Sequence, residues 1–93
     1  KFFSFGSVNV KVLANDLEFS SLGISIGIKF SKKAVERNRA KRQIREIFRK
    51  KADLVKAGFD IVVMLKPGQK KTITSPELEI MLVNALKKAK VIN

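Results

Sequence analysis

Apolar side chains recur at every second position in two segments of the first third of the chain, residues 8–13 and 22–30. A period of two is typical of a strand that buries one face. The residues with this spacing are Val8, Val10 and Val12, and then Leu22, Ile24, Ile26, Ile28 and Phe30. We therefore predict two strands joined by a turn at 14–21. The aromatic-rich residues 1–5 form a short segment that this pattern does not assign.

The apolar spacing becomes helical after the second strand. Residues 34–57 carry one apolar stripe, and Gly58 is a natural end for such a helix. The stripe consists of Ala40, Ile44, Ile47, Phe48 and Val55. Residues 61–65 are continuously apolar, which favours a strand covered on both faces by helices. A last helix is expected to begin near Pro76, which suits a first turn, and its apolar face contains Leu78, Met81, Leu82, Ala85, Leu86 and Ala89.

The order of strands, helix, strand and helix predicts an α+β fold, a two-layer sandwich with one helical layer. A chain of 93 residues, of which 45% are hydrophobic, can bury a modest core, so we expect residues 1–93 to form one domain. No apolar run approaches the roughly 20 residues that cross a bilayer. The chain has no Cys, which suits a reducing cytoplasm.

The charge of the chain narrows the class of partner. Its 20 Lys and Arg residues and 8 Asp and Glu residues give a formal net charge of +12. Such a charge on a small domain is typical of a protein that binds a polyanion, either a nucleic acid or an anionic membrane surface. The membrane surface is disfavoured because the apolar side of the basic helix is needed for the core.

All five arginines fall within residues 37–49, and every other basic residue is a lysine. Arginine has a planar guanidinium group that binds a phosphate with two hydrogen bonds. The confinement of arginine to one helix therefore indicates a phosphate-binding site with defined donor positions. A helical wheel places one polar stripe opposite Ile44: Asn38, Arg42, Arg45 and Arg49, continued by Lys56. We expect Glu46 to orient its neighbours, and Arg37 and Arg39 to hold a phosphate near the helix start. The alternative is a solvated basic face without a ligand.

The polar face of the predicted sheet is a second candidate surface. Gly23, Ser25 and Gly27 leave it without bulky side chains, which favours a shallow trough. Single-stranded RNA favours such a surface when cations and aromatic rings line it. The candidates are Asn9, Lys11 and Lys29 beside the trough, and Phe2, Phe3 and Phe5 for stacking. Two alternatives stay open: the phenylalanines belong to the core, and the small residues make room for a helix. The basic turn at 66–71 is a weaker candidate.

Catalytic groups of the common kinds are sparse. The chain has no His and no Cys, and its eight carboxylates form no convincing metal cluster: Asp16, Glu18, Glu36, Glu46, Asp53, Asp60, Glu77 and Glu79. We therefore expect no metal site, no tightly bound cofactor and no small-molecule substrate on this chain. If the protein takes part in hydrolysis, another molecule supplies the catalytic groups.

The segment 34–49 resembles the signature of the bacterial ribonuclease P protein component. That family carries Arg-Asn-Arg, then Lys-Arg, then Arg-Glu with an aromatic residue. The same order stands here at Arg37-Asn38-Arg39, Lys41-Arg42 and Arg45-Glu46, with Phe48. Residues 23–26, residues 60–63 and the last helix are also similar to the family, so the resemblance covers nearly the whole chain.

The resemblance implies a small, mostly antiparallel four-stranded sheet packed with helices and an unusual left-handed βαβ crossover. It also implies a ribonucleoprotein endonuclease that removes the 5′ leader of precursor tRNA, in which the RNA subunit is the ribozyme and holds the magnesium ions. The residues that match the motif contacting the RNA subunit are Arg37, Asn38, Arg39, Lys41, Arg42 and Arg45, extended by Arg49. The leader is expected in the trough, at Phe3, Asn9, Lys11, Ser25 and Lys29. We expect the sequence to lack the basic N-terminal helix that lines the trough in this family.

The alternative function is that of a general RNA-binding or ribosomal protein with no role in processing. Such a protein would bind many structured RNAs about equally. The leading hypothesis predicts instead that the chain cleaves nothing alone and lowers the magnesium requirement of one cognate RNA.

Overall fold

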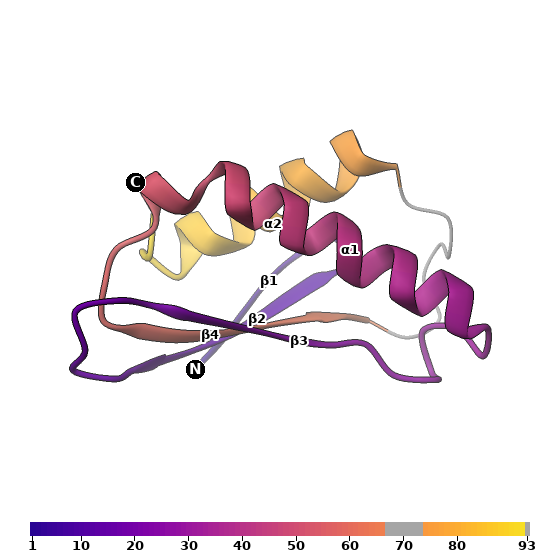
Figure 1. The fold of residues 1–93 in the computed structure, drawn as a ribbon, viewed down its shortest axis with the longest axis horizontal. Helices are drawn as coiled ribbons and strands as arrows, with labels where there is room; N and C mark the ends of the chain where they lie inside the picture. Colours follow the sequence, from indigo (N-terminus) through magenta and orange to yellow (C-terminus); the bar gives the residue numbers. More distant parts are fainter. Residues whose placement is uncertain (67–73, 93) are drawn as a thin grey trace.

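Two layers make up the part of the chain that the computed structural model describes, residues 1–66 and 74–92. Within it, one layer is a four-stranded sheet of β1 (Phe2–Phe5), β2 (Val8–Ala14), β3 (Ser21–Ser25) and β4 (Phe59–Leu65). The other layer contains α1 (Ala34–Lys50), a short 3-10 helix (Ala52–Leu54) and α2 (Ser75–Lys88). Figure 1 shows α1 and α2 on the same side of the sheet. The predicted α+β sandwich with one helical layer is confirmed.

The sheet has the strand order β1-β2-β4-β3, so the two strands that flank α1 in sequence lie side by side. β2 is antiparallel to both of its neighbours, whereas β3 and β4 are parallel. In Figure 1, β3 lies nearest the viewer, β4 lies behind it, and both run from left to right beneath the helices. The connection through α1 is therefore left-handed, against the usual right-handed preference, and agrees with the crossover that the resemblance implies.

The inner face of the sheet, turned toward the helices, supplies one side of the core. The register of β2 and β4 pairs Val10 with Val63, and both side chains are fully buried. The helices supply the other side through Ala40, Ile44, Ile47, Leu78, Leu82, Ala85 and Leu86. Burial of one large apolar side chain contributes about 1.5–3 kcal/mol. This packing holds α1 by its inner stripe and turns the opposite side of the helix to solvent.

The start of α2 is fixed by a capping box. The Glu77 backbone N–H donates to Thr74 Oγ1 (3.3 Å), and the Thr74 backbone N–H donates to Glu77 Oε1 (3.3 Å). Pro76 lies in the first turn, where its missing N–H is tolerated. The prediction that the last helix begins near Pro76 is confirmed.

Two predicted elements are longer than the observed ones. β3 ends at Ser25, because the chain turns where the Phe30 N–H donates to the Gly27 carbonyl (3.1 Å), and Ile28 is 68% exposed. α1 ends at Lys50 rather than at residue 57. Beyond the 3-10 helix, the backbone N–H of Lys56 donates to the carbonyl of Val91 (2.8 Å), which ties this segment to the end of the chain.

The prediction that residues 61–65 are covered on both faces is wrong for the described part of the chain. Ile61, Val63 and Leu65 are buried beneath the helices, whereas Val62 and Met64 are half-buried on the opposite side. No described helix covers this opposite side, which we call the outer face (Figure 1). β4 lies between β2 and β3 in the sheet, and its apolar side chains on this opposite side are half-buried without a described helix over them. Of the basic turn predicted at 66–71, residues 67–71 lie outside the described residues.

Candidate nucleic-acid interface

The polar stripe predicted on α1 faces solvent. Its members, Asn38, Arg42, Arg45 and Arg49, are all solvent-accessible, and we refer to them as the arginine stripe. Ile44, on the other side of the helix, is fully buried. The predicted division of α1 into a packed side and a basic side is confirmed. Lys56 is exposed but lies beyond the end of the helix, so it does not continue the stripe along the same axis.

Glu46 accompanies the arginine stripe, as predicted, and pairs with Arg49. Its Oε1 forms an ion pair with Nη2 of Arg49, three residues later. The two side chains are 50% and 75% exposed, so the pair contributes only about 0–1 kcal/mol. Glu36, the other carboxylate of α1, accepts a hydrogen bond from the Ser31 hydroxyl. The stripe therefore keeps an excess of positive charge.

The loop before α1 gives Arg37 a role that the sequence did not predict. Nη1 of Arg37 donates to the carbonyl of Ser31 (2.8 Å), and the Ser31 hydroxyl oxygen accepts from the backbone N–H of Lys33 (3.1 Å). Ser31 is only 2% exposed. Arg37 thus holds the loop against the start of the helix with one of its donors. Ser31 was missed because a lone serine in a basic segment carries no periodic signal.

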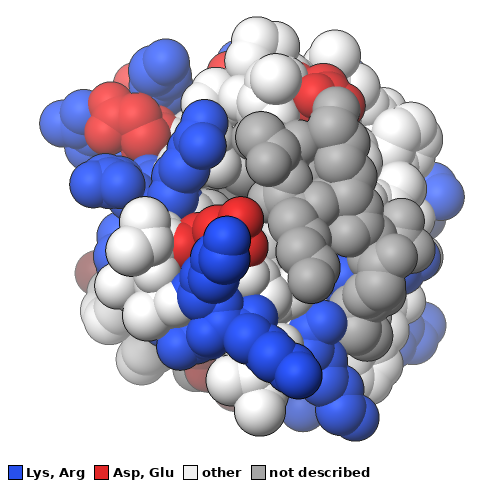
Figure 2. Space-filling model, turned by 90° about the vertical axis from the view of Figure 1, so that its right-hand side faces the viewer, with Lys and Arg blue, Asp and Glu red and all other residues white. Residues whose placement is uncertain are grey.

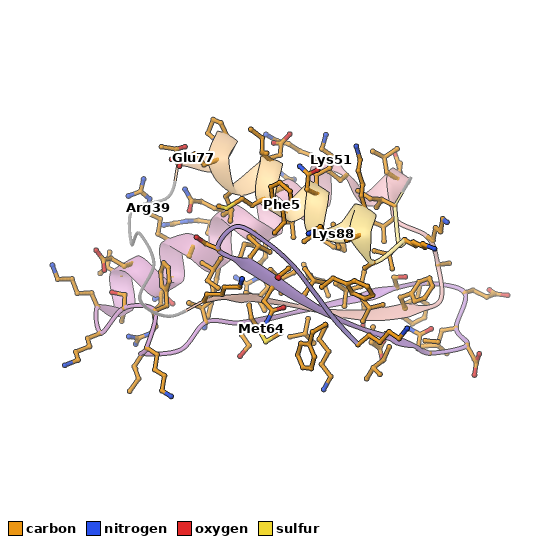
Figure 3. The ribbon with its side chains drawn as sticks, turned by 180° about the vertical axis from the view of Figure 1, so that it is seen from behind. Phe5, Arg39, Lys51, Met64, Glu77 and Lys88 are labelled. Atoms are coloured by element: carbon orange, nitrogen blue, oxygen red, sulfur yellow. The ribbon has the colours of Figure 1, made fainter. Side chains whose placement is uncertain are left out.

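The remaining residues of the motif lie beside the arginine stripe. Arg39 is exposed and projects from the body of the molecule in Figure 3, whereas Lys41 is half-buried. Figure 2 looks at the end of the molecule where α1 begins and shows Lys and Arg side chains gathered over it. The loop before α1 adds exposed lysines to this end: Lys29, Lys32 and Lys33.

Strand register arranges the outer face in three rows that run across the sheet. The first row, nearest the loop before α1, consists of Ser4, Asn9, Met64 and Ser25. The central row consists of Phe2, Lys11, Val62 and Gly23. The third row consists of Leu13, Asp60 and Ser21. Figure 3 shows Met64 pointing away from the helices, in accord with this assignment.

Three of the five residues predicted to form the trough share the outer face: Asn9, Lys11 and Ser25. Lys29 lies beyond the end of β3, in the exposed loop that follows the first row. The placement of Phe3 in the trough is wrong. Phe3 pairs with buried Val10 and faces the helices, where it lines a hollow together with Lys88 of α2.

Phe2 takes the place on the outer face that was assigned to Phe3. Phe2 is 62% exposed, and Nζ of Lys11 lies 5.7 Å from the centre of its ring. Phe5 is on the inner side, where Nζ of Lys88 lies 5.4 Å from its ring (Figure 3). The turn at Gly6, which has a φ of +60°, fixes this register, and a shift of one residue would exchange the faces.

Asp60 is the carboxylate of the outer face. Its Oδ1 accepts hydrogen bonds from Nδ2 of Asn15 (2.8 Å) and from the hydroxyl of Ser21 (2.7 Å). The hydrogen bond from Asn15, followed by that from Ser21, lowers the pKa of Asp60 below its ordinary value. The third row thus carries a fixed negative charge, which the sequence pattern did not assign to the trough.

The described residues contain neither a cluster of metal ligands nor a membrane-spanning helix. Among them, no three carboxylates gather where they could hold a metal ion. Within the same residues, neither helix is long and apolar enough to cross a bilayer. The candidate nucleic-acid interface of the described chain consists of two solvent-facing surfaces, the arginine stripe and the outer face.

Comparison with known proteins gives a consistent set of relatives. The family model described as Ribonuclease P matches residues 1–90. The ribonuclease P protein component of Stutzerimonas stutzeri is 50% identical over 72 residues, which are 75% of this chain and 53% of that protein. That of Thermotoga petrophila is 52% identical over 50 residues, which are 54% of this chain and 42% of that protein. The chain thus spans about half the length of these curated relatives.

Solved structures share the fold over almost the whole chain. The RNase P protein from Thermotoga maritima, in complex with 1-(4-fluorophenyl)-2-thiourea, superposes with a TM-score of 0.83 at 35% identity, covering 95% of this chain and 84% of that one. The RNase P protein of Staphylococcus aureus gives a TM-score of 0.82 at 32% identity, covering 99% of this chain and 84% of that one.

Proposed function

Because the chain belongs to the ribonuclease P protein family, we propose that it is the RNA-binding subunit of a ribonucleoprotein that removes the 5′ leader of precursor tRNA. In this proposal the arginine stripe binds the catalytic RNA, and the outer face receives the single-stranded leader. The catalytic groups and the magnesium ions belong to the RNA subunit, and the chain acts by binding and positioning.

The exposure of the arginine stripe directly opposite the core carries this proposal. Arg42 and Arg45 are exposed on a helix whose other side is fully buried, so a polyanion can reach them without any rearrangement of the fold. Guanidinium groups bind phosphate oxygens in pairs of hydrogen bonds. The helix spaces these groups regularly, since residues three and four apart lie on one side of it. Such a row fits the phosphates of a structured RNA.

The leader is assigned to the outer face because the chemistry there suits unpaired nucleotides. Phe2 offers an exposed ring for stacking, Lys11 offers a cation beside it, and Ser25 offers a hydroxyl. Base stacking on an aromatic ring contributes about 1–3 kcal/mol per base. Gly23 has no side chain in the central row, so a base can approach the backbone of the strands closely.

Competition between RNAs tests the proposal against a general RNA-binding or ribosomal role. The chain is titrated against ribonuclease P RNA in the presence of ribosomal RNA fragments of equal length, at matched salt. We expect a clear preference for ribonuclease P RNA. We also expect the chain to lower the magnesium concentration that this RNA needs to cleave leader-bearing precursor tRNA. Equal affinity for all RNAs together with an unchanged magnesium requirement would favour the general role.

A further inference from the structure

The outer face is divided by charge along the direction of its strands. One end is followed by the exposed lysines of the loop before α1, Lys29, Lys32 and Lys33. The other end is followed by the exposed carboxylates of the loop between β2 and β3, Asp16 and Glu18. The sheet itself repeats this division, since Lys11 stands in the central row and Asp60 in the third row. A phosphate chain on this face therefore meets attraction at one end and repulsion at the other.

The negative charge at the third row is held in place. Asn15 and Ser21 both donate to Oδ1 of Asp60, and the backbone N–H of Asn15 donates to the carbonyl of Gly58 (2.9 Å). These bonds fasten the loop between β2 and β3 to the start of β4. These hydrogen bonds therefore hold the Asp60 carboxylate in position when a phosphate approaches.

We infer that Asp60 limits the path of single-stranded RNA on the outer face, so that the RNA crosses the first and central rows and stays off the third. This inference rests on the proposed function and assigns Asp60 as a residue that determines where the leader lies. Stacking, cationic charge and hydroxyl groups are available in the first and central rows. The third row offers Leu13, the Ser21 hydroxyl, which already donates to Asp60, and a like charge, which a phosphate backbone avoids.

The absence of cysteine makes this path measurable, because a single introduced cysteine carries a photo-crosslinker at one position. Ser25→Cys marks the first row and Leu13→Cys marks the third, and both positions are exposed. The probe is a short single-stranded RNA of mixed sequence, with yields normalised to thiol labelling. We expect crosslinking from position 25 to exceed that from position 13 roughly fivefold or more.

A charge-neutral variant tests the role of Asp60 itself. Asp60→Asn in the Leu13→Cys background should raise crosslinking from position 13 by roughly fivefold. Asp53→Asn is the matched control, because Asp53 is an exposed carboxylate in the 3-10 helix, away from the sheet, and should leave the yield unchanged. Thermal unfolding confirms that each variant is folded, and the comparison of positions 25 and 13 needs no change at Asp60.

Three outcomes separate this inference from the proposed function. Equal crosslinking from positions 25 and 13, or no response to Asp60→Asn in a folded variant, would overturn the inference and leave the outer face as an RNA surface. Crosslinking from neither position, with RNA still bound through α1, would overturn both the inference and the leader assignment. Crosslinking that is stronger from position 25 than from position 13 in the parent chain, and that rises at position 13 in Asp60→Asn, supports both.

Discussion

The arginine stripe of α1 and the outer face of the sheet both meet solvent, but their surface chemistry differs. The stripe concentrates guanidinium groups on one side of a rigid helix. The outer face spreads Phe2, Lys11 and small polar groups over four strands and ends at a carboxylate. A dense row of cations gives affinity that depends on salt and little on base sequence, whereas a sparse aromatic and polar face responds to unpaired bases. Under the proposed function, the arginine stripe would attach the domain to RNA and the outer face would recognise a single strand.

The largest effect is expected on the packed side of α1, directly behind the arginine stripe. Ile44→Ala removes a fully buried side chain and opens a cavity, so the free energy of unfolding should fall by about 2–5 kcal/mol. Denaturant unfolding measures this decrease. Arg45→Ala, one residue away on the exposed side, should change it by less than about 0.5 kcal/mol. Equal decreases for the two variants would contradict the division of the helix.

RNA affinity should depend on the exposed arginines of α1, in contrast to the free energy of unfolding, which depends on the buried side. Arg42→Ala and Arg45→Ala should each weaken binding to ribonuclease P RNA by about 1–3 kcal/mol, because each removes a charge-assisted hydrogen bond to a phosphate. Equilibrium binding at moderate salt measures the change. Lys87→Ala on α2 also removes one exposed positive charge and serves as the control, with little expected effect. If the control weakens binding as much as the arginine variants, then net charge alone explains the affinity.

Replacing each of two neighbouring phenylalanines by alanine, one at a time, distinguishes the outer face of the sheet from the inner side. Phe2→Ala should reduce the preference for leader-bearing over leaderless precursor tRNA by about 1–3 kcal/mol, through the loss of stacking. Phe3→Ala changes the inner side and should leave this preference intact while it lowers the melting temperature. Binding assays with the assembled ribonucleoprotein measure the preference. A loss of the preference in Phe3→Ala but not in Phe2→Ala would show that Phe3, and not Phe2, contacts the leader.

The smallest effect is expected when the pH is lowered, and it concerns the loop between β2 and β3. The pKa of Asp60 is lowered in the folded chain by the hydrogen bonds from Asn15 and Ser21. The stabilisation from this ionised carboxyl is fully present above the pKa of the unfolded chain and is lost as the pH falls through the lowered folded value. Acid titration should therefore loosen the loop between β2 and β3 only below the ordinary Asp range. Hydrogen exchange at Asn15 should show this loosening in the parent chain and not in Asp60→Asn.

Periodicity predicts most of this fold because local chemistry determines each element. The buried stripe of α1, the start of α2 at Pro76 and the alternation of β2 all follow from residues close together in sequence. The same reasoning made β3 too long. Ile26 and Phe30 are buried, but they lie in the loop after β3 rather than in the strand. The handedness of the crossover depends on how distant segments pack, and only the resemblance anticipated it.

The sequence predicted correctly which side chains face solvent where helical spacing decided the answer, and it failed where strand register decided it. The arginine stripe follows from helical geometry alone. Phe2 and Phe3 are adjacent in sequence, and only the pairing with Lys11 and Val10 decides which ring faces outward. Asp60 was missed for a related reason, because its partners Asn15 and Ser21 lie far from it in sequence and reach it through the sheet.

The salt dependence of RNA binding tests the central claim most directly. Affinity for ribonuclease P RNA is measured over a range of salt concentrations for the parent chain and for the Arg42→Ala, Arg45→Ala double variant. If these side chains bind phosphates, the slope of log affinity against log salt is steep for the parent. It should be shallower in the double variant by roughly 0.7–0.9 for each phosphate that the protein no longer neutralises. Equal slopes for the two proteins would show that the arginine stripe does not touch RNA phosphates.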